Sequence, residues 1–282
     1  MRIPTWCSEC ATGGELGEHS PKNEDIYMVD VEDDNAYVGR CSHGHVVAFT
    51  LDTLRFELLF ESGIVALLAG FHREAVSSIA AALERFYEFS IEALAAVAEV
   101  PQGLFETAWK MVSSQSERQL GAYSFVYLTT FKRPFLATKE EQKTFQEWAT
   151  FRNNVIHKGQ FPPRARVIEY AQYVFDVIRE RKTELQRHSP AVYQEVERRQ
   201  ASRSRDVATE KLKAIEPKPV PNAKGAVPGV GSTDYGTMLS RAAKDGPRNF
   251  AAELELAKKN LWMWGVCARE SVETRATPPD RD

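Results

Sequence analysis

The spacing of apolar residues divides the chain into a short part with the pattern of strands and a longer part with the pattern of helices. Before residue 50, apolar residues occur in short runs that Asp, Asn and Gly interrupt, and these runs predict strands over residues 25–31, 36–40 and 46–49. From residue 53 onward they recur every three or four positions, which is the period of an amphipathic helix. We therefore expect a mainly α protein in which a small β unit precedes a helical bundle.

Residues 53–187 carry the strongest helical pattern and are expected to form a compact all-α bundle. The expected helices cover residues 54–68, 74–97, 104–112, 120–127, 138–157 and 167–178. Two sequences, Ser116 to Gln119 and Thr138 to Glu141, resemble the capping boxes that start helices. Gly159 and the prolines behind it mark the end of the helix that begins after Thr138.

The remainder of the chain is expected to be less compact. Residues 190–213 are highly charged and predict an extended, solvated helix, whereas residues 215–233 are rich in Pro and Gly and predict a linker. Residues 234–270 predict a short helical tail that docks on the bundle of the same chain or on a partner, of which we prefer the same chain, and residues 277–282 should be disordered. The expected units are a zinc-ribbon-like β unit (1–52), a helical bundle (53–187), a charged helix with a linker (188–233) and a helical tail with a disordered end (234–282).

Cysteine and histidine residues in the β unit predict a structural zinc site. Cys7 and Cys10 form a C-x2-C pair, and Cys41 opens a turn that also contains His43 and His45. Thiolate and imidazole ligands on two turns joined by short strands are typical of a zinc ribbon, which is too small to be stable without its metal. The expected ligands are Cys7, Cys10, Cys41 and either His45 or His43; we prefer His45 because the glycine before it permits a tight turn. The alternative is a set of unrelated buried cysteines and surface histidines.

The chain shows neither the apolar core of a signal peptide at its N-terminus nor a run of about 18 apolar residues that would predict a membrane span. We therefore expect a cytoplasmic protein without a membrane partner. In that compartment its cysteines would bind metal or be buried, rather than form structural disulfides.

The formal net charge of −3 gives no indication of a nucleic-acid partner, but the charge is unevenly distributed. Residues 1–61 carry 4 Lys/Arg and 12 Asp/Glu, whereas residues 150–213 carry 14 Lys/Arg and 8 Asp/Glu. The basic half could attract a phosphate backbone, or it could be an ordinary solvated helical surface.

The most distinctive stretch is Phe-Arg-Asn-Asn-Val-Ile-His-Lys-Gly, in which Arg152 and His157 lie five positions apart. This spacing alone is common, because Arg40/His45 and Arg181/His188 also fit Arg-x(4–6)-His. The context distinguishes Arg152/His157 from the other two pairs. A polar residue follows the arginine, apolar residues precede the histidine, and a helix stop follows directly after it.

Five positions on an α-helix are about 140° apart, so Arg152 and His157 do not share one face. Both side chains would converge in a groove between two copies of the helix, as a symmetric dimer provides. A homodimer is therefore the expected state.

The sequence Arg152-Asn153-x-x-x-His157 resembles the Arg-x(4–6)-His signature of the HEPN superfamily of helical bundles, and the segment around Glu84 resembles an early helix of many prokaryotic HEPN proteins. The resemblance covers about residues 55–187. It implies a metal-independent endoribonuclease that acts as a dimer in bacterial antiphage defence, abortive infection or a toxin–antitoxin stress response. RNA is the implied substrate, and an antitoxin or defence-system protein is a further implied partner.

The chemistry of RNA cleavage assigns a role to each residue. Histidine titrates near neutral pH, so His157 would be the acid/base that acts on the 2′-hydroxyl, and the planar guanidinium of Arg152 would clamp the phosphate. Asn153 would orient the substrate by hydrogen bonding, Glu84 would hold Arg152 from the neighbouring helix, and Lys158 would add affinity for the backbone. The products would be a 2′,3′-cyclic phosphate and a 5′-hydroxyl, and no cofactor would take part.

Plainer interpretations stand beside these. An Arg/His pair at a helix end can serve only capping or surface chemistry, Asn153 can cap the helix, and Glu84 can be an ordinary exposed residue. The bundle could also be a non-catalytic module for dimerisation or for nucleotide or RNA binding that acts with a partner protein.

Overall fold

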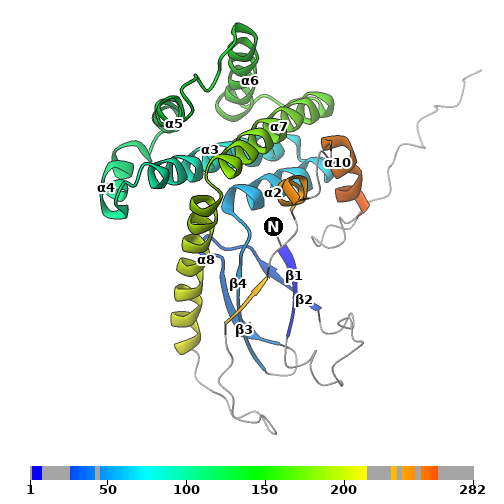
Figure 1. The fold of residues 1–282 in the computed structure, drawn as a ribbon. Helices are drawn as coiled ribbons and strands as arrows, with labels where there is room; N and C mark the ends of the chain where they lie inside the picture. The colour runs from blue at the N-terminus through cyan, green and yellow to red at the C-terminus, as the bar shows by residue number, and fades with distance from the viewer. Residues whose placement is uncertain are drawn as a thin grey trace, which may run out of the picture.

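The computed structural model describes residues 2–7, 26–41, 45–214, 230–233, 237–244 and 249–259. Figure 1 shows a group of helices on one side of a small strand region, with one long helix running down beside the strands. The structure confirms the mainly helical class. No described helix combines the length and the apolar character that crossing a membrane requires.

The strands form two small sheets. In the first, β1 (Arg2–Trp6) pairs antiparallel with β2 (Ile26–Asp30). In the second, β3 (Ala36–Arg40) pairs antiparallel with β4 (Val46–Leu51), and β4 pairs parallel with β5 (Gly231–Thr233). The strands β2, β3 and β4 correspond to the three predicted ones.

Two strands were not predicted. The segment of β1 contains a proline, which weakens a strand pattern, and β5 lies at the end of the stretch predicted to be a linker. The three residues of β5 have no apolar alternation, so its strand conformation depends on pairing with β4 rather than on a local signal.

Nine helices are described. They are α2 (Arg55–Leu68), α3 (His72–Val97), α4 (Gln102–Val112), α5 (Ser116–Phe131), α6 (Lys139–Lys158), α7 (Arg164–His188), α8 (Pro190–Lys213), α9 (Met238–Lys244) and α10 (Phe250–Lys259). The first six cover the six predicted bundle helices, with ends that shift by a few residues.

The two predicted capping boxes had different outcomes. Thr138 and Glu141 form the predicted box at the start of α6, and Gly159 ends this helix with a left-handed φ of 71°. The box predicted at Ser116 is wrong, because α5 begins at Ser116 itself and no side chain caps it. The Gln119 side chain is used elsewhere: its amide nitrogen donates to the Ser113 carbonyl at 2.6 Å.

Helix α3 is the centre of the bundle and packs against α2, α5, α6 and α7. Its contact with α2 is close at Gly63, where a Cβ atom would lie 2.5 Å from the Ile79 side chain. Aromatic side chains fill much of the core, among them Phe56, Phe86 and Phe175, which are fully buried. The bundle therefore has enough buried apolar surface to fix the helices that carry the candidate site.

Helix α8 is not simply solvated. It contacts β3 and β4, buries Tyr193, Val196 and Ala208, and its Lys211 ammonium lies 2.9 Å from both Glu32 and Asp34. The predicted division into four units stays a prediction, although α8 and β5 both contact the sheet of the first unit.

Helices α9 and α10 pack against α2 and α7, as the predicted docking of the tail on its own bundle requires. Phe250 of α10 lies 5.6 Å from the ring of Phe175. The rest of the predicted tail, including the end predicted to be disordered, falls outside the described residues.

Candidate functional site

Cys7, Cys41 and His45 form a group that could hold a metal ion. Cys7 follows β1, Cys41 follows β3 and His45 precedes β4, and their ligand atoms all lie within 4.8 Å of one another. The His45 Nδ1 is 3.8 Å from the Cys7 Sγ and 3.5 Å from the Cys41 Sγ. Two ligands of one tetrahedral Zn²⁺ lie roughly 3.3–3.8 Å apart, so these separations suit zinc.

The surroundings of this group also suit a structural metal. Cys7 and Cys41 are buried beside Tyr37, Phe49 and neighbouring apolar side chains. Cys7 comes from one sheet, whereas Cys41 and His45 come from the other, so a bound ion would join the two sheets. The fourth predicted ligand, Cys10, and the alternative ligand His43 lie outside the described residues.

Arg152 projects from α6 toward α3, where its guanidinium forms an ion pair with Glu84. A second guanidinium nitrogen donates to Asn153 Oδ1 at 2.8 Å. The Arg152 side chain is 19% exposed. These contacts fix the guanidinium but use only two of its five N–H donors, so others remain for a ligand.

His157 lies in the last turn of α6 with Lys158, and both side chains are exposed. The structure therefore does not bury the imidazole against its own core. As the helical spacing predicts, His157 is not among the residues that line the cavity beside Arg152.

The cavity beside Arg152 has a volume of about 290 Å³ and lies between α3, α5, α6 and α7. Its polar lining consists of one cation, two carboxylates and three neutral side chains: Arg152, Glu84, Glu117, Ser116, Gln146 and Asn153. Its other walls carry aromatic side chains: Tyr87, Phe145, Trp148, Tyr170 and Tyr173.

Burial dominates the electrostatics of the tyrosines in this cavity. It raises the pKa of Tyr173 to about 12 and that of Tyr170 above its usual range. For Tyr170, the nearby charge of Arg152 opposes this rise and that of Glu84 adds to it. These tyrosines are neutral hydrogen-bonding groups at physiological pH.

Around the end of α6, the chain is locally basic. Residues 152–166 contain three Arg, one Lys and no Asp or Glu. Arg73 of α3 adds a further cation, because its Nε donates to the Val155 carbonyl of α6 at 3.3 Å. Phe161, in the loop after α6, is 86% exposed. No role was predicted for Arg73, whose contact with the Val155 carbonyl joins residues 82 positions apart.

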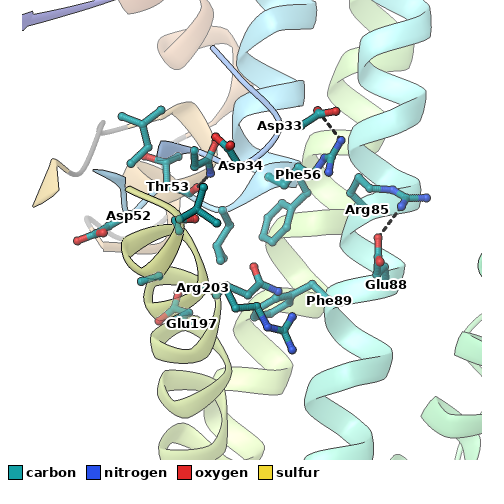
Figure 2. A pocket seen from close by; sticks show the side chains of 18 residues that line it. Asp33, Asp34, Asp52, Thr53, Phe56, Arg85, Glu88, Phe89, Glu197 and Arg203 are labelled. Carbon is teal, nitrogen blue, oxygen red and sulfur yellow. Dashed lines mark hydrogen bonds and ion pairs between the residues drawn. The ribbon is translucent and has the colours of Figure 1, made fainter. Parts of the chain in front are cut away.

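A larger cavity, of about 360 Å³, lies between the strand region, α2, α3 and α8 (Figure 2). Five carboxylates and three arginines line it. All three arginines are paired: Arg55 lies 2.7 Å from Asp33, Arg85 lies 2.6 Å from Glu88, and Arg203 lies 3.7 Å from Glu92. The excess of negative charge makes this cavity a poor site for a phosphate backbone.

Comparison with known proteins gives no further assignment, because no protein-family model, curated protein or solved structure matches the chain.

Proposed function

We propose that the protein is a metal-independent endoribonuclease of the HEPN type, with a zinc ion that stabilises its N-terminal β unit. The observation that carries the proposal is the end of α6: Arg152 is held by Glu84, and His157 is exposed on a segment that has cations and no carboxylates. The motif suits an acid/base and a phosphate clamp, and the local charge suits an RNA backbone.

In the proposed reaction, the ribose 2′-oxygen attacks the adjacent phosphorus while His157 takes the 2′-hydroxyl proton. Arg152 stabilises the charge on the non-bridging oxygens. The bond from phosphorus to the 5′-oxygen breaks, and the leaving oxygen takes up the proton that His157 carries. The products are a 2′,3′-cyclic phosphate and a 5′-hydroxyl, and Asn153 and Lys158 contribute hydrogen bonding and charge.

The proposal includes a homodimer. The two side chains are about 140° apart around α6, and only the Arg152 side chain lines the cavity. A second copy that pairs at this helix would bring the histidine of one chain to the arginine of the other. Antiphage defence, abortive infection or a toxin–antitoxin stress response is the proposed setting, with an antitoxin or defence protein as partner, and it rests on the resemblance alone.

The test compares RNA cleavage by the full chain and by His157→Ala in the presence of EDTA. We expect the variant to lose at least about a hundredfold in rate, as removal of an acid/base does. His188→Ala is the matched control, because His188 is also an exposed histidine in the last turn of a helix and also follows an arginine at a motif-like spacing. Equal cleavage by His157→Ala and the unaltered chain would reject the site. The zinc content of the protein is measured in the same EDTA buffer, because the comparison requires that EDTA does not remove the zinc and unfold the β unit.

The second candidate is a non-catalytic module that dimerises or binds nucleotide or RNA. It is favoured by the Glu84 carboxylate, which pairs with Arg152 and neutralises its charge. A dimer that binds RNA and leaves every RNA intact would support this function instead.

A further inference from the structure

Helices α9 and α10 are held on α2 and α7 by buried charged side chains as well as by apolar packing. We propose that these two helices form a pH-sensitive latch, which docks with the uptake of one proton at Glu61 and opens as the pH rises. The proposal goes beyond RNA cleavage and depends on neither Arg152 nor His157.

The apolar part of the contact would dock the two helices equally well at any pH. Phe250 of α10 is 1% exposed, and its ring centroid lies 5.6 Å from that of Phe175 of α7. Met238 and Leu239 of α9 are buried as well. Burial of apolar surface does not depend on the protonation of a side chain, so a dependence on pH must come from charged groups at the same contact.

Three carboxylates and two cations lie where the four helices meet. Glu57 and Glu61 come from α2, Lys182 from α7, Arg241 from α9 and Glu253 from α10. Lys182 lies 2.5 Å from Glu57, and the Arg241 guanidinium lies 2.9 Å from Glu253. Among the described residues, Glu61 is therefore the carboxylate of this group that has no cation of its own.

Helix α3 also packs against α2, but on the other side. Its close contact is at Gly63, where a Cβ atom would meet the Ile79 side chain. Two positions on an α-helix are about 200° apart, so Glu61 points away from α3 and its charged residues.

Glu61 is buried at the docking contact itself. It is 2% exposed, and its Oε2 accepts the backbone N–H of Met238, the first residue of α9, at 3.0 Å. A buried carboxylate without a cation is costly in its ionised form and takes up a proton instead. Burial accordingly raises the pKa of Glu61; the Met238 N–H and Arg241 oppose the rise, whereas Glu253 and Glu57 add to it. Since Glu253 belongs to α10, docking also brings a like charge to Glu61.

Undocking of α9 and α10 would expose Glu61 to water, where its pKa returns to the ordinary value of 4.5. At a pH above this value, the docked state binds more protons than the open state. The equilibrium constant for docking therefore falls by up to about tenfold for each pH unit. The fall begins near the ordinary pKa and ends at the raised pKa of the docked state. At lower pH both states are protonated, so docking is strongest there and does not depend on pH.

The experiment measures amide hydrogen exchange of the full chain by mass spectrometry between pH 5 and pH 8, with rates corrected for the intrinsic effect of pH. We expect the protection of α10 amides to fall by up to about tenfold per pH unit while the amides of α3 stay protected. Glu61→Gln should remove this dependence, because glutamine is neutral and can still accept the Met238 N–H. Glu92→Gln is the matched control, since Glu92 is a carboxylate of 6% exposure that lies near Arg203 of α8 rather than at the latch.

A second variant separates docking from the uptake of the proton. Phe250→Ala removes an apolar anchor of α10, so it should lower the protection of α10 at every pH and leave the slope against pH unchanged. Three results would overturn the latch: protection of α10 that does not vary with pH, an equal slope in Glu61→Gln and the unaltered chain, or loss of protection in α3 and α10 together. A slope that differs in Phe250→Ala would also count against it, and this result does not require Glu61→Gln to fold.

Discussion

A buried ion pair between α2 and α7 offers a sharp test of how the bundle is held together. Glu57 and Lys182 are each 4% exposed, and the Lys182 Nζ lies 2.5 Å from Glu57 Oε1. The ammonium also lies 5.8 Å from the ring centroid of Phe56. Charges so far from solvent are stable only while each compensates the other.

Replacing Lys182 with Met keeps the length of the side chain and removes its charge. Glu57 would then be a buried carboxylate without its partner, and such a loss costs about 3–5 kcal/mol of the free energy of unfolding. Domains are typically stable by about 5–15 kcal/mol, so this single change would remove a large share of the total.

The measurement is urea denaturation at pH 7 followed by circular dichroism, with Lys182→Met, Glu57→Leu and the double variant compared. The double variant should be much more stable than the sum of the single losses predicts, because it removes both buried charges and keeps an apolar contact. Lys213→Met is the control: its partner Glu210 lies 2.7 Å away, but both side chains are at least 66% exposed. A surface pair of this kind contributes about 0–1 kcal/mol.

A loss below about 1 kcal/mol in Lys182→Met would refute the reasoning, because it would mean that solvent reaches the pair as it reaches a surface pair. Additive losses in the double variant would refute it as well, since they would show that the two charges do not depend on each other.

Three other predictions concern the cap of α6, the tail and the metal group. Thr138→Ala should lower the free energy of unfolding by about 1 kcal/mol in urea denaturation, whereas Thr138→Ser should retain the capping box. Burial raises the pKa of Glu61 from its ordinary value of 4.5, and this carboxylate accepts the Met238 backbone N–H at 3.0 Å. Its contribution to stability is therefore fully present below pH 4.5 and is lost as pH rises through the raised pKa, so Glu61→Gln should flatten the decline of Tm above that pH. Cys41→Ser should reduce the zinc bound per chain by at least half, measured by atomic emission after purification in zinc, while the same substitution at Cys267 should not change it.

The parts of the fold that sequence predicts well are those with local signals. The start of α6 at Thr138 and its end at Gly159 depend on residues within one turn of the helix end, and both were predicted. The spacing of Cys7, Cys41 and His45 around short strands likewise anticipates the group that the structure brings together.

The features that sequence did not predict depend on residues far apart in the chain. The pair of Glu57 and Lys182 spans 125 positions, and Lys182 stands in a run of charged residues that looks entirely exposed. Gln119 fits a capping box locally, yet its side chain bonds to Arg85 and to the Ser113 carbonyl instead. A local pattern cannot decide whether Gln119 caps a helix or makes these other bonds, because the packing of α3 against α5 decides between them.

Contacts between distant residues also determine how variants at the candidate site can be interpreted. Helix α6 buries only Trp148 and Val155, and polar or aromatic contacts such as the ion pair of Arg152 with Glu84 attach it to the bundle. The same side chains also line the cavity. Replacing Arg152 would therefore weaken the attachment of α6 to the bundle as well as remove any catalytic role of the guanidinium. His157 differs: it is exposed, and among the described residues it has no hydrogen-bond partner or ring contact. Replacing it should alter the free energy of unfolding by about 1 kcal/mol or less, the scale of a helix-end charge, so a loss of cleavage in His157→Ala at unchanged stability would report on chemistry alone.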